Sequence, residues 1–154
     1  MTLHFAYGSN MSRPHMRARC PKATAIGVAS LAGWRFAINP DGYGTVVPHP
    51  GAVTLGVLWH LTPRDLAALN AYENLAGGLY RCRVLPVSVG GRRQPALVYL
   101  ARRCGEGIPR PGYIALVAAA AHDWGLPERY IRSLMRWSPS RWQGAPAKDA
   151  GEVG

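Results

Sequence analysis

The chain begins with an aromatic strand that passes directly into a turn of small polar residues, the segment 5–11 with the sequence FAYGSNM. Gly8 permits a tight bend or a positive φ, and Ser9 and Asn10 can hold the bend through local hydrogen bonds. Ser12 is typical of a helix start immediately afterwards. Because a strand that ends just before a helix turns several backbone N–H groups outward together, this segment predicts a pocket for an anion or a polarised carbonyl oxygen.

A second feature is a helix that carries an acid on its inward face. Thr62 is a suitable cap, Pro63 suits the first helical position, and Asp65 is predicted to reach back to the cap. Spaced i, i+3, i+4 and i+7, the inward face comprises Leu66, Leu69, Asn70 and Glu73. A carboxylate in the last turn faces the negative end of the helix dipole, which is unfavourable unless another role requires it.

The other seven acids of the chain have ordinary roles. They are the cap residue Asp65, Glu128 at a helix start, Asp41 in a turn, Glu106 in a loop, Asp123 near a helix end, and Asp149 and Glu152 near the C-terminus. Elimination therefore leaves Glu73 as the acid best placed for chemistry. The alternative is that Glu73 reaches solvent from a fraying helix end.

At this point the residues carry a family resemblance. The segments 5–11 (FAYGSNM), 69–73 (LNAYE) and 78–81 (GLYR) are similar to motifs of the γ-glutamylcyclotransferase family, and the resemblance extends over about residues 3–137. It implies an α+β fold, a small mixed β-barrel flanked by α-helices, and a site without a cofactor. Enzymes of this family cyclise a γ-glutamyl group to 5-oxoproline and release the attached amine, which implies a place in glutathione metabolism.

The resemblance also implies roles for individual residues. Glu73 matches the catalytic acid of the family. The substrate-binding loop is matched by Tyr7, Gly8, Ser9, Asn10 and Met11, and the pocket-lining tyrosines are matched by Tyr80, Tyr99 and Tyr113. Asn74 stands where many relatives have glycine. In such a site Glu73 takes a proton from the α-amino group of the substrate and then passes it to the leaving amine.

The organisation of the chain is that of one domain, residues 1–139, followed by an Ala-, Gly- and Pro-containing segment, residues 140–154, that is predicted to be disordered. Strands are expected at about 2–7, 23–30, 34–39, 44–48, 53–61, 79–89 and 94–101, and helices at about 12–19, 62–73, 111–124 and 127–137. Gly90-Gly91 predicts a hairpin turn, and Gly125 predicts a helix end.

Cysteine and histidine spacings give no metal or redox motif. The three cysteines, Cys20, Cys82 and Cys104, are scattered, which favours reduced thiols. No metal is expected. The sequence shows no secretion signal and no apolar stretch long enough to span a bilayer, so we expect a cytoplasmic protein without membrane contact.

The charge of +10 and the pI near 10.3 are the features that favour a nucleic-acid partner. The arginines, however, are dispersed, with no basic run of five or more, which argues against nucleic acid. A positive surface that steers carboxylate-rich substrates is another interpretation. A non-catalytic interaction module on the same fold, binding an anionic partner or RNA, stays the alternative to an enzyme. The preferred leaving group and the oligomeric state, with a homodimer among the options, stay open.

Overall fold

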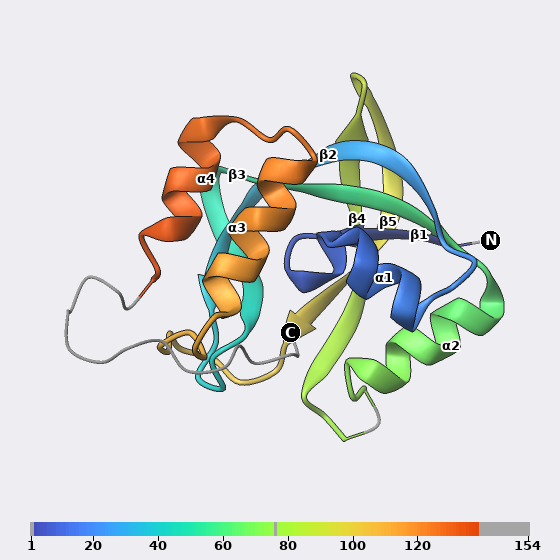
Figure 1. Ribbon diagram of the computed structural model, residues 1–154, viewed down its shortest axis with the longest axis horizontal. Helices are drawn as coiled ribbons and strands as arrows, with labels where there is room; N and C mark the ends of the chain where they lie inside the picture. The colour runs from blue at the N-terminus through green and yellow to red at the C-terminus, as the bar shows by residue number, and fades with distance from the viewer. Residues whose placement is uncertain (1, 76, 139–154) are drawn as a thin grey trace.

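The computed structural model describes residues 2–75 and 77–138, and five strands within them close into a barrel (Figure 1). The strands follow the order β1-β3-β2-β4-β5 around it. Their bounds are Thr2–Ala6 for β1, Thr24–Ile38 for β2, Gly44–Leu61 for β3, Tyr80–Val89 for β4 and Arg92–Ala101 for β5. Neighbours are antiparallel except β1 and β5, which pair in parallel with His4 opposite Leu97. The predicted α+β class with a small mixed barrel is confirmed.

Strands β2 and β3 are longer than the sequence pattern predicts. The pattern places breaks at residues 31–33 and 49–52, but both segments belong to continuous strands, so these two predicted breaks are wrong. Gly33 explains the first of them because it adopts a φ of +86°, a left-handed conformation that glycine enters without steric cost. The register shifts between Ala32 and Trp34. The glycine therefore marks an irregularity that bends a paired strand without ending it.

Within the described residues, four helices and one 3-10 turn surround the barrel. Their bounds are Ser9–Met11 for the turn η1, Arg13–Arg19 for α1, Pro63–Tyr72 for α2, Tyr113–Asp123 for α3 and Glu128–Met135 for α4. The four predicted helices are confirmed, with ends that agree to within two residues. Helices α1 and α2 lie on one side in Figure 1 and α3 and α4 on the other, while η1 contacts both α1 and α3.

The start of α2 differs from the prediction in one respect. The Thr62 hydroxyl accepts a hydrogen bond of 3.1 Å from the Asp65 N–H, as a cap should. The Asp65 carboxylate, however, accepts a hydrogen bond of 3.1 Å from the Lys22 N–H and makes no capping box. The prediction that Asp65 reaches back is therefore wrong; this buried side chain instead ties the turn before β2 to α2.

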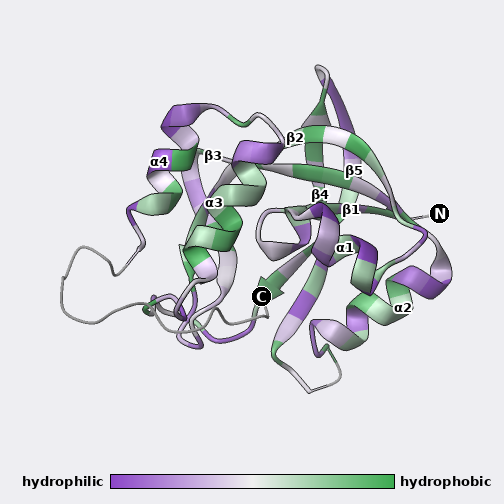
Figure 2. Ribbon diagram, in the orientation of Figure 1, coloured by the Kyte–Doolittle hydropathy of each residue, from purple (hydrophilic) through white to green (hydrophobic). Residues whose placement is uncertain are grey.

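The barrel interior and the inner faces of the helices form one hydrophobic core that includes Phe5, Val57, Leu69 and Val117. Figure 2 shows this pattern: α3 is hydrophobic along most of its length, whereas α4 alternates between polar and apolar residues. None of the described helices combines the length and apolar character needed to cross a membrane. The segment 140–154, predicted to be disordered, lies outside the described residues.

Candidate active site

A small cavity lies where β1 ends, beside the C-terminal end of α2. Residues of five separate segments line it: His4, Phe5, Ala6, Tyr7, Gly8, Ser9, Asn10, Gly44, Glu73, Tyr80 and Tyr99. The cavity thus brings together the turn after β1 and Glu73, which are more than sixty residues apart in the sequence. Met11 and Tyr113, also predicted site residues, are buried nearby but do not line it.

The turn after β1 is held from both sides. The Met11 N–H donates to the Gly8 carbonyl over 3.0 Å, and the Met11 carbonyl accepts 2.7 Å away from the Trp124 indole N–H at the end of α3. Gly8 itself has φ −120° and ψ −134°, so of the two options in the sequence it takes the tight bend and not the positive φ. Ser9 and Asn10 are buried. The turn is therefore a packed element, and its side chains keep fixed positions.

Glu73 is the residue at the C-terminal cap of α2, and its side chain is only 6% exposed. One carboxylate oxygen, Oε2, accepts a hydrogen bond of 3.0 Å from the Asn10 side-chain amide. No ion pair joins this carboxylate to another described residue. Burial raises the pKa of Glu73 to about 7, and the Arg19 charge and the Asn10 hydrogen bond offset part of that rise. A buried carboxyl that titrates near neutral pH can both accept and donate a proton.

The backbone just after Glu73 turns sharply. Asn74 has φ +56°, and among the described residues it is the single non-glycine residue with a positive φ. Its N–H donates to Ala71, and the Leu75 N–H donates to Asn70, a pair of bonds that defines a Schellman motif. Helix α3 ends in the same way with glycine at the equivalent position, Gly125. Asparagine tolerates the left-handed conformation, so it can replace the glycine of relatives here.

We expect Asn74→Ala to lower the free energy of unfolding by about 1 kcal/mol, because alanine lacks the side-chain amide through which asparagine tolerates a positive φ, whereas Asn74→Gly should change it by less than about 0.5 kcal/mol. The alanine variant also loses the bond from the Gly77 N–H to Asn74 Oδ1. Urea denaturation of the three proteins measures both effects. Gly125→Ala is the matched control and should show a similar loss. An Asn74→Ala variant as stable as the wild type would mean that the helix end relaxes into another conformation.

The tyrosines around the cavity donate their hydroxyl protons to the protein itself. The Tyr7 hydroxyl donates to the Tyr99 carbonyl over 2.5 Å, the Tyr99 hydroxyl to Asn70 Oδ1 over 2.5 Å, and the Tyr80 hydroxyl to the Gly44 carbonyl over 2.8 Å. Burial raises the pKa of all three phenols, so each stays neutral at physiological pH. These three hydroxyl oxygens can therefore still accept hydrogen bonds from a ligand.

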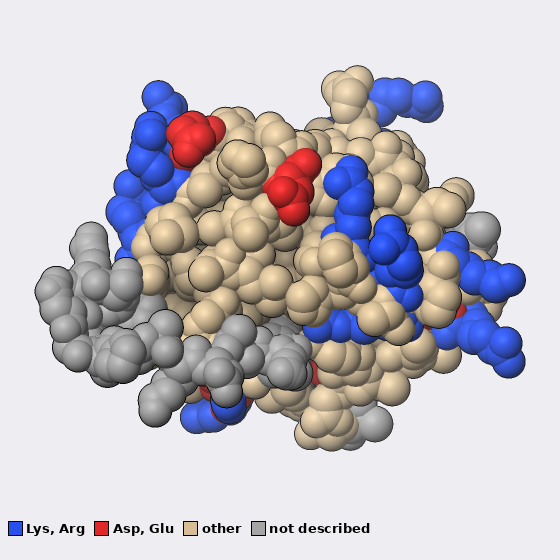
Figure 3. Space-filling model, viewed as in Figure 1, with Lys and Arg blue, Asp and Glu red and all other residues tan. Residues whose placement is uncertain are grey.

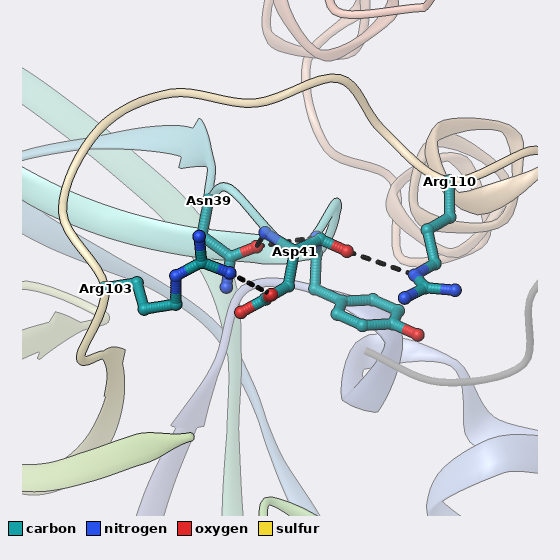
Figure 4. A network of polar contacts seen from close by, with 5 residues as sticks. Asn39, Asp41, Arg103 and Arg110 are labelled. Atoms are coloured by element: carbon teal, nitrogen blue, oxygen red, sulfur yellow. Dashed lines mark hydrogen bonds and ion pairs between the residues drawn. The ribbon is translucent and has the colours of Figure 1, made fainter. Parts of the chain in front are cut away.

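Gly44, which also lines the cavity, is held by a second layer of contacts. Its N–H donates over 3.0 Å to the hydroxyl of Tyr113, which places Tyr113 behind the cavity wall. A polar network on the preceding turn fastens this segment to the loop before α3 (Figure 4). In that network Arg103 pairs with the Asp41 carboxylate at 2.6 Å, and Arg110 donates to the Asp41 carbonyl over 3.0 Å. Two arginines of one loop thereby fix the start of β3.

Two residues near the cavity were not predicted from the sequence. Arg19, the last residue of α1, donates to the side chains of both Ser9 and Asn10. His4 is 2% exposed, its Nδ1 lies 3.3 Å from the Leu97 carbonyl, and burial lowers its pKa to about 4. Neither residue belongs to a recognisable sequence motif. A basic residue at the end of a short helix and a histidine in a strand are both ordinary features of a sequence.

No described group of three or more His, Cys, Asp or Glu side chains is arranged to hold a metal ion. The cysteines are free: Cys20 is buried, Cys82 is half-buried and Cys104 is exposed. Burial raises the pKa of the Cys20 thiol to about 11, so it is a packed side chain and not a nucleophile.

The fold and the cavity define a class: a compact α+β barrel protein with one buried carboxyl group in a pocket that is otherwise lined by neutral residues. The family model described as "Gamma-glutamyl cyclotransferase, AIG2-like" matches residues 4–124. The chain belongs to this family.

Individual relatives agree with the family match. The chain is 26% identical to a gamma-glutamylcyclotransferase of mouse over 153 residues, which cover 92% of this chain and 81% of the relative. It is also 26% identical to a human gamma-glutamylcyclotransferase over 164 residues, covering 98% and 86%. A solved structure named gamma-glutamyl cyclotransferase superposes with a TM-score of 0.84 at 25% identity, covering 96% of this chain and 94% of the other.

Proposed function

We propose that this protein is a γ-glutamyl cyclotransferase, which converts a γ-glutamyl amino acid or amine to 5-oxoproline and the free amine. Glu73 is the general base and then the general acid. The reaction needs neither an oxidant nor a second substrate, because the nucleophile and the electrophile belong to one molecule. Relatives at 26% identity with the same named activity support the reaction type.

The observation that carries this proposal is the carboxyl of Glu73 inside the cavity, with its pKa raised to about 7. An α-ammonium group has a pKa of about 7.7–8.0, so an ordinary glutamate is a poor base for it by about 3–4 units, or about 5 kcal/mol. With a pKa of about 7 the mismatch falls to about one unit, or about 1.4 kcal/mol. Burial thus gives Glu73 a basicity close to that of the group it deprotonates.

The bond changes follow from this arrangement. Glu73 takes a proton from the α-ammonium group, and the amine nitrogen attacks the γ-carbonyl carbon to form the ring C–N bond. Glu73 then returns this proton to the departing nitrogen as the original amide C–N bond breaks, and the ring nitrogen loses its second proton, so that 5-oxoproline leaves as the lactam and the released amine becomes an ammonium ion. Backbone N–H groups in the turn after Tyr7 would stabilise the oxyanion, and one such donor typically contributes about 2.7–4 kcal/mol. The Met11 N–H is already bonded to the Gly8 carbonyl and is therefore not such a donor.

The tyrosines contribute acceptors to this scheme. Since Tyr7, Tyr80 and Tyr99 donate their protons to protein oxygens, their hydroxyl oxygens are suited to accept hydrogen bonds from the substrate ammonium group. A neutral acceptor holds the ammonium without forming an ion pair, so the proton can still leave toward Glu73.

The alternative, a non-catalytic module for an anionic partner or RNA, calls for a Glu73 that is buried or ion-paired and for arginines gathered on one face. Glu73 is buried, but it makes no ion pair with a described residue, lines the cavity and bonds a neutral amide. On the face shown in Figure 3, basic side chains lie in separate groups over α4, over α1 and α2, and at the tip of the β4–β5 hairpin, with uncharged and some acidic surface between them. Both observations support the enzyme.

The experiment that tests the proposal is a mass-spectrometric assay of 5-oxoproline release from γ-glutamyl dipeptides, γ-glutamylamines and glutathione. We expect the wild type to turn over at least one of these classes. Glu73→Gln should lower kcat by about 10²–10⁴-fold, because the amide can neither accept nor donate the proton. The preferred substrate of the panel identifies the leaving group.

Asp65→Asn is the matched control, since Asp65 is the other buried acid of α2 and bonds Lys22 away from the cavity. It should retain activity within about threefold of the wild type once its fold is verified by thermal melting. Wild-type turnover by Glu73→Gln would remove Glu73 as the base. A folded wild type that releases no 5-oxoproline from any of the three classes would contradict the proposed reaction.

A further inference from the structure

Arg19 connects three parts of the site without facing the cavity itself. Its Nη1 donates to Ser9 Oγ over 3.0 Å and to Asn10 Oδ1, the two buried side chains of the turn after β1. Its guanidinium carbon also lies 3.7 Å from the centre of the Tyr72 ring, on the last turn of α2. Tyr72 immediately precedes Glu73. The guanidinium therefore lies between the turn after β1 and the helix end that carries the carboxyl.

The contact with Arg19 determines which way the Asn10 amide points. A guanidinium has donors and no acceptor, so the atom of Asn10 that faces it must be the oxygen. The NH₂ group of Asn10 then points the other way, where it donates to Glu73 Oε2 over 3.0 Å. Without Arg19 the Asn10 amide could flip by about 180°. Its oxygen would then face the Glu73 carboxylate, and two acceptor oxygens repel each other. Arg19 thus fixes the direction of two consecutive hydrogen bonds, from Arg19 to Asn10 and from Asn10 to Glu73.

The charge of Arg19 also acts on Glu73 and lowers its pKa, although the two make no direct ion pair. The other titratable groups that feel the charge of Glu73 come from several elements: Tyr7 just after β1, Tyr80 and Cys82 of β4, Tyr99 of β5 and Tyr113 of α3. Phenols and thiols with raised pKa values are neutral near pH 7. The charge that counters the burial of Glu73 is therefore that of Arg19.

We propose that Arg19 is a positioning residue for the cyclisation: through the Asn10 amide it holds the Glu73 carboxylate in place and keeps it ionisable inside the cavity. This inference rests on the proposed function, in which Glu73 is the base. A direct ion pair would tie the carboxylate too strongly for it to accept a proton, whereas an intervening neutral amide gives a weaker stabilisation. The buried base Glu73 is thus separated from the positive charge of Arg19 by the side-chain amide of Asn10.

Removing the cation should raise the pKa of Glu73, because burial then acts against a weaker offset. In Arg19→Met, we expect the acid limb of the kcat/KM profile to move up by about one pH unit. The value of kcat/KM at pH 7 should fall about 10- to 100-fold, and the loss should shrink near pH 9, where Glu73 is ionised again. Arg19→Lys keeps the positive charge but not the planar guanidinium that donates to both Ser9 and Asn10. The acid limb of its pH profile should therefore stay near that of the wild type, while kcat falls.

Arg17→Met is the matched control, because Arg17 is an exposed arginine on the same helix. It should follow the wild-type pH profile within about twofold. Thermal melting of each variant separates misfolding from mispositioning. A uniform loss in Arg19→Met, with an unmoved pH midpoint and the same loss in Arg19→Lys, would reduce Arg19 to a structural role and overturn the proposal.

A second readout does not depend on turnover. The side-chain carboxyl carbon of Glu73 can be titrated by ¹³C NMR, with Glu73→Gln used to assign its signal. The midpoint should move to higher pH in Arg19→Met and stay unchanged in Arg17→Met. If the wild type releases no 5-oxoproline but this midpoint moves, the proposed function fails while the coupling between Arg19 and Glu73 stands. If the midpoint does not move, the proposal is overturned whatever the activity.

Discussion

Replacing Glu73 by glutamine is expected to stabilise the protein at pH 8 by about 3 kcal/mol. Burial raises the pKa of this carboxyl from 4.5 to about 7, so the folded state holds the proton more tightly than the unfolded chain does. At low pH the carboxyl is protonated in both states and costs nothing. As the pH rises from about 4.5 to about 7, the unfolded chain ionises first and wild-type stability falls. Above pH 7 the full cost of a buried carboxylate remains.

Glutamine has no such charge, so the stability of Glu73→Gln should lack this decline. Urea denaturation at pH 5 and pH 8 measures the effect: the two proteins should differ by less than about 1 kcal/mol at pH 5 and by about 3 kcal/mol at pH 8. Glu128→Gln, an exposed acid in the first turn of α4, is the control and should change stability by less than about 1 kcal/mol at both pH values. A variant that is less stable than the wild type at pH 8 would contradict the raised pKa. The expected gain accompanies a loss of activity, which is typical of an active-site residue held at a cost in stability.

The second large effect is expected at Gly56, in the part of β3 that pairs with β2. A Cβ at this position would lie 2.2 Å from the Ala6 carbonyl oxygen and 2.9 Å from the Phe5 ring. Since the nearest atom belongs to the backbone of β1, no side-chain rotation can relieve the clash. We expect Gly56→Ala to lower the free energy of unfolding by about 3 kcal/mol or more. Because β1 leads directly into the turn at Gly8, the variant should also bind substrate less well.

Gly51→Asn is the control for that experiment. Gly51 lies on the same strand with a φ of +86°, and no atom lies within 4 Å of its Cβ position. Asparagine tolerates that conformation, so the variant should lose less than about 1 kcal/mol. Chemical denaturation of the two variants therefore compares a steric clash with a change in backbone preference. If Gly56→Ala were as stable as the wild type, β1 and β3 would be able to move slightly apart without lowering the free energy of unfolding.

Local features of the chain could be predicted well from the sequence. The cap at Thr62, the hairpin turn at Gly90 and Gly91 with its two positive φ angles, and the end of α3 at Gly125 all occur as the local chemistry predicts. Glu73 is also buried, as its place on the inward stripe of α2 predicted. These features depend on residues within about one helical turn or one hairpin of each other, so a linear sequence contains the information they need.

Features that depend on distant segments could not be predicted in the same way. The break predicted at residues 31–33 does not occur, because pairing with β3 keeps β2 continuous through the irregular residue Gly33. Asp65 has the spacing of a capping residue, yet Lys22 offers its carboxylate a backbone donor from another segment. In both cases a long-range contact decides between two local options of similar free energy.

The sequence by itself determined where the four helices lie to within two residues, where the hairpin turn at Gly90 and Gly91 lies, and that Glu73 stands on a buried face. Only the tertiary structure decided that Glu73 lies against Asn10, that Arg19 orients the Asn10 amide, and that Tyr7, Tyr80 and Tyr99 donate their protons to other parts of the protein. The reason is that propensity and periodicity act over a few neighbouring residues. The pKa of a carboxyl group, in contrast, depends on every charge, donor and apolar atom that the closed barrel brings around it.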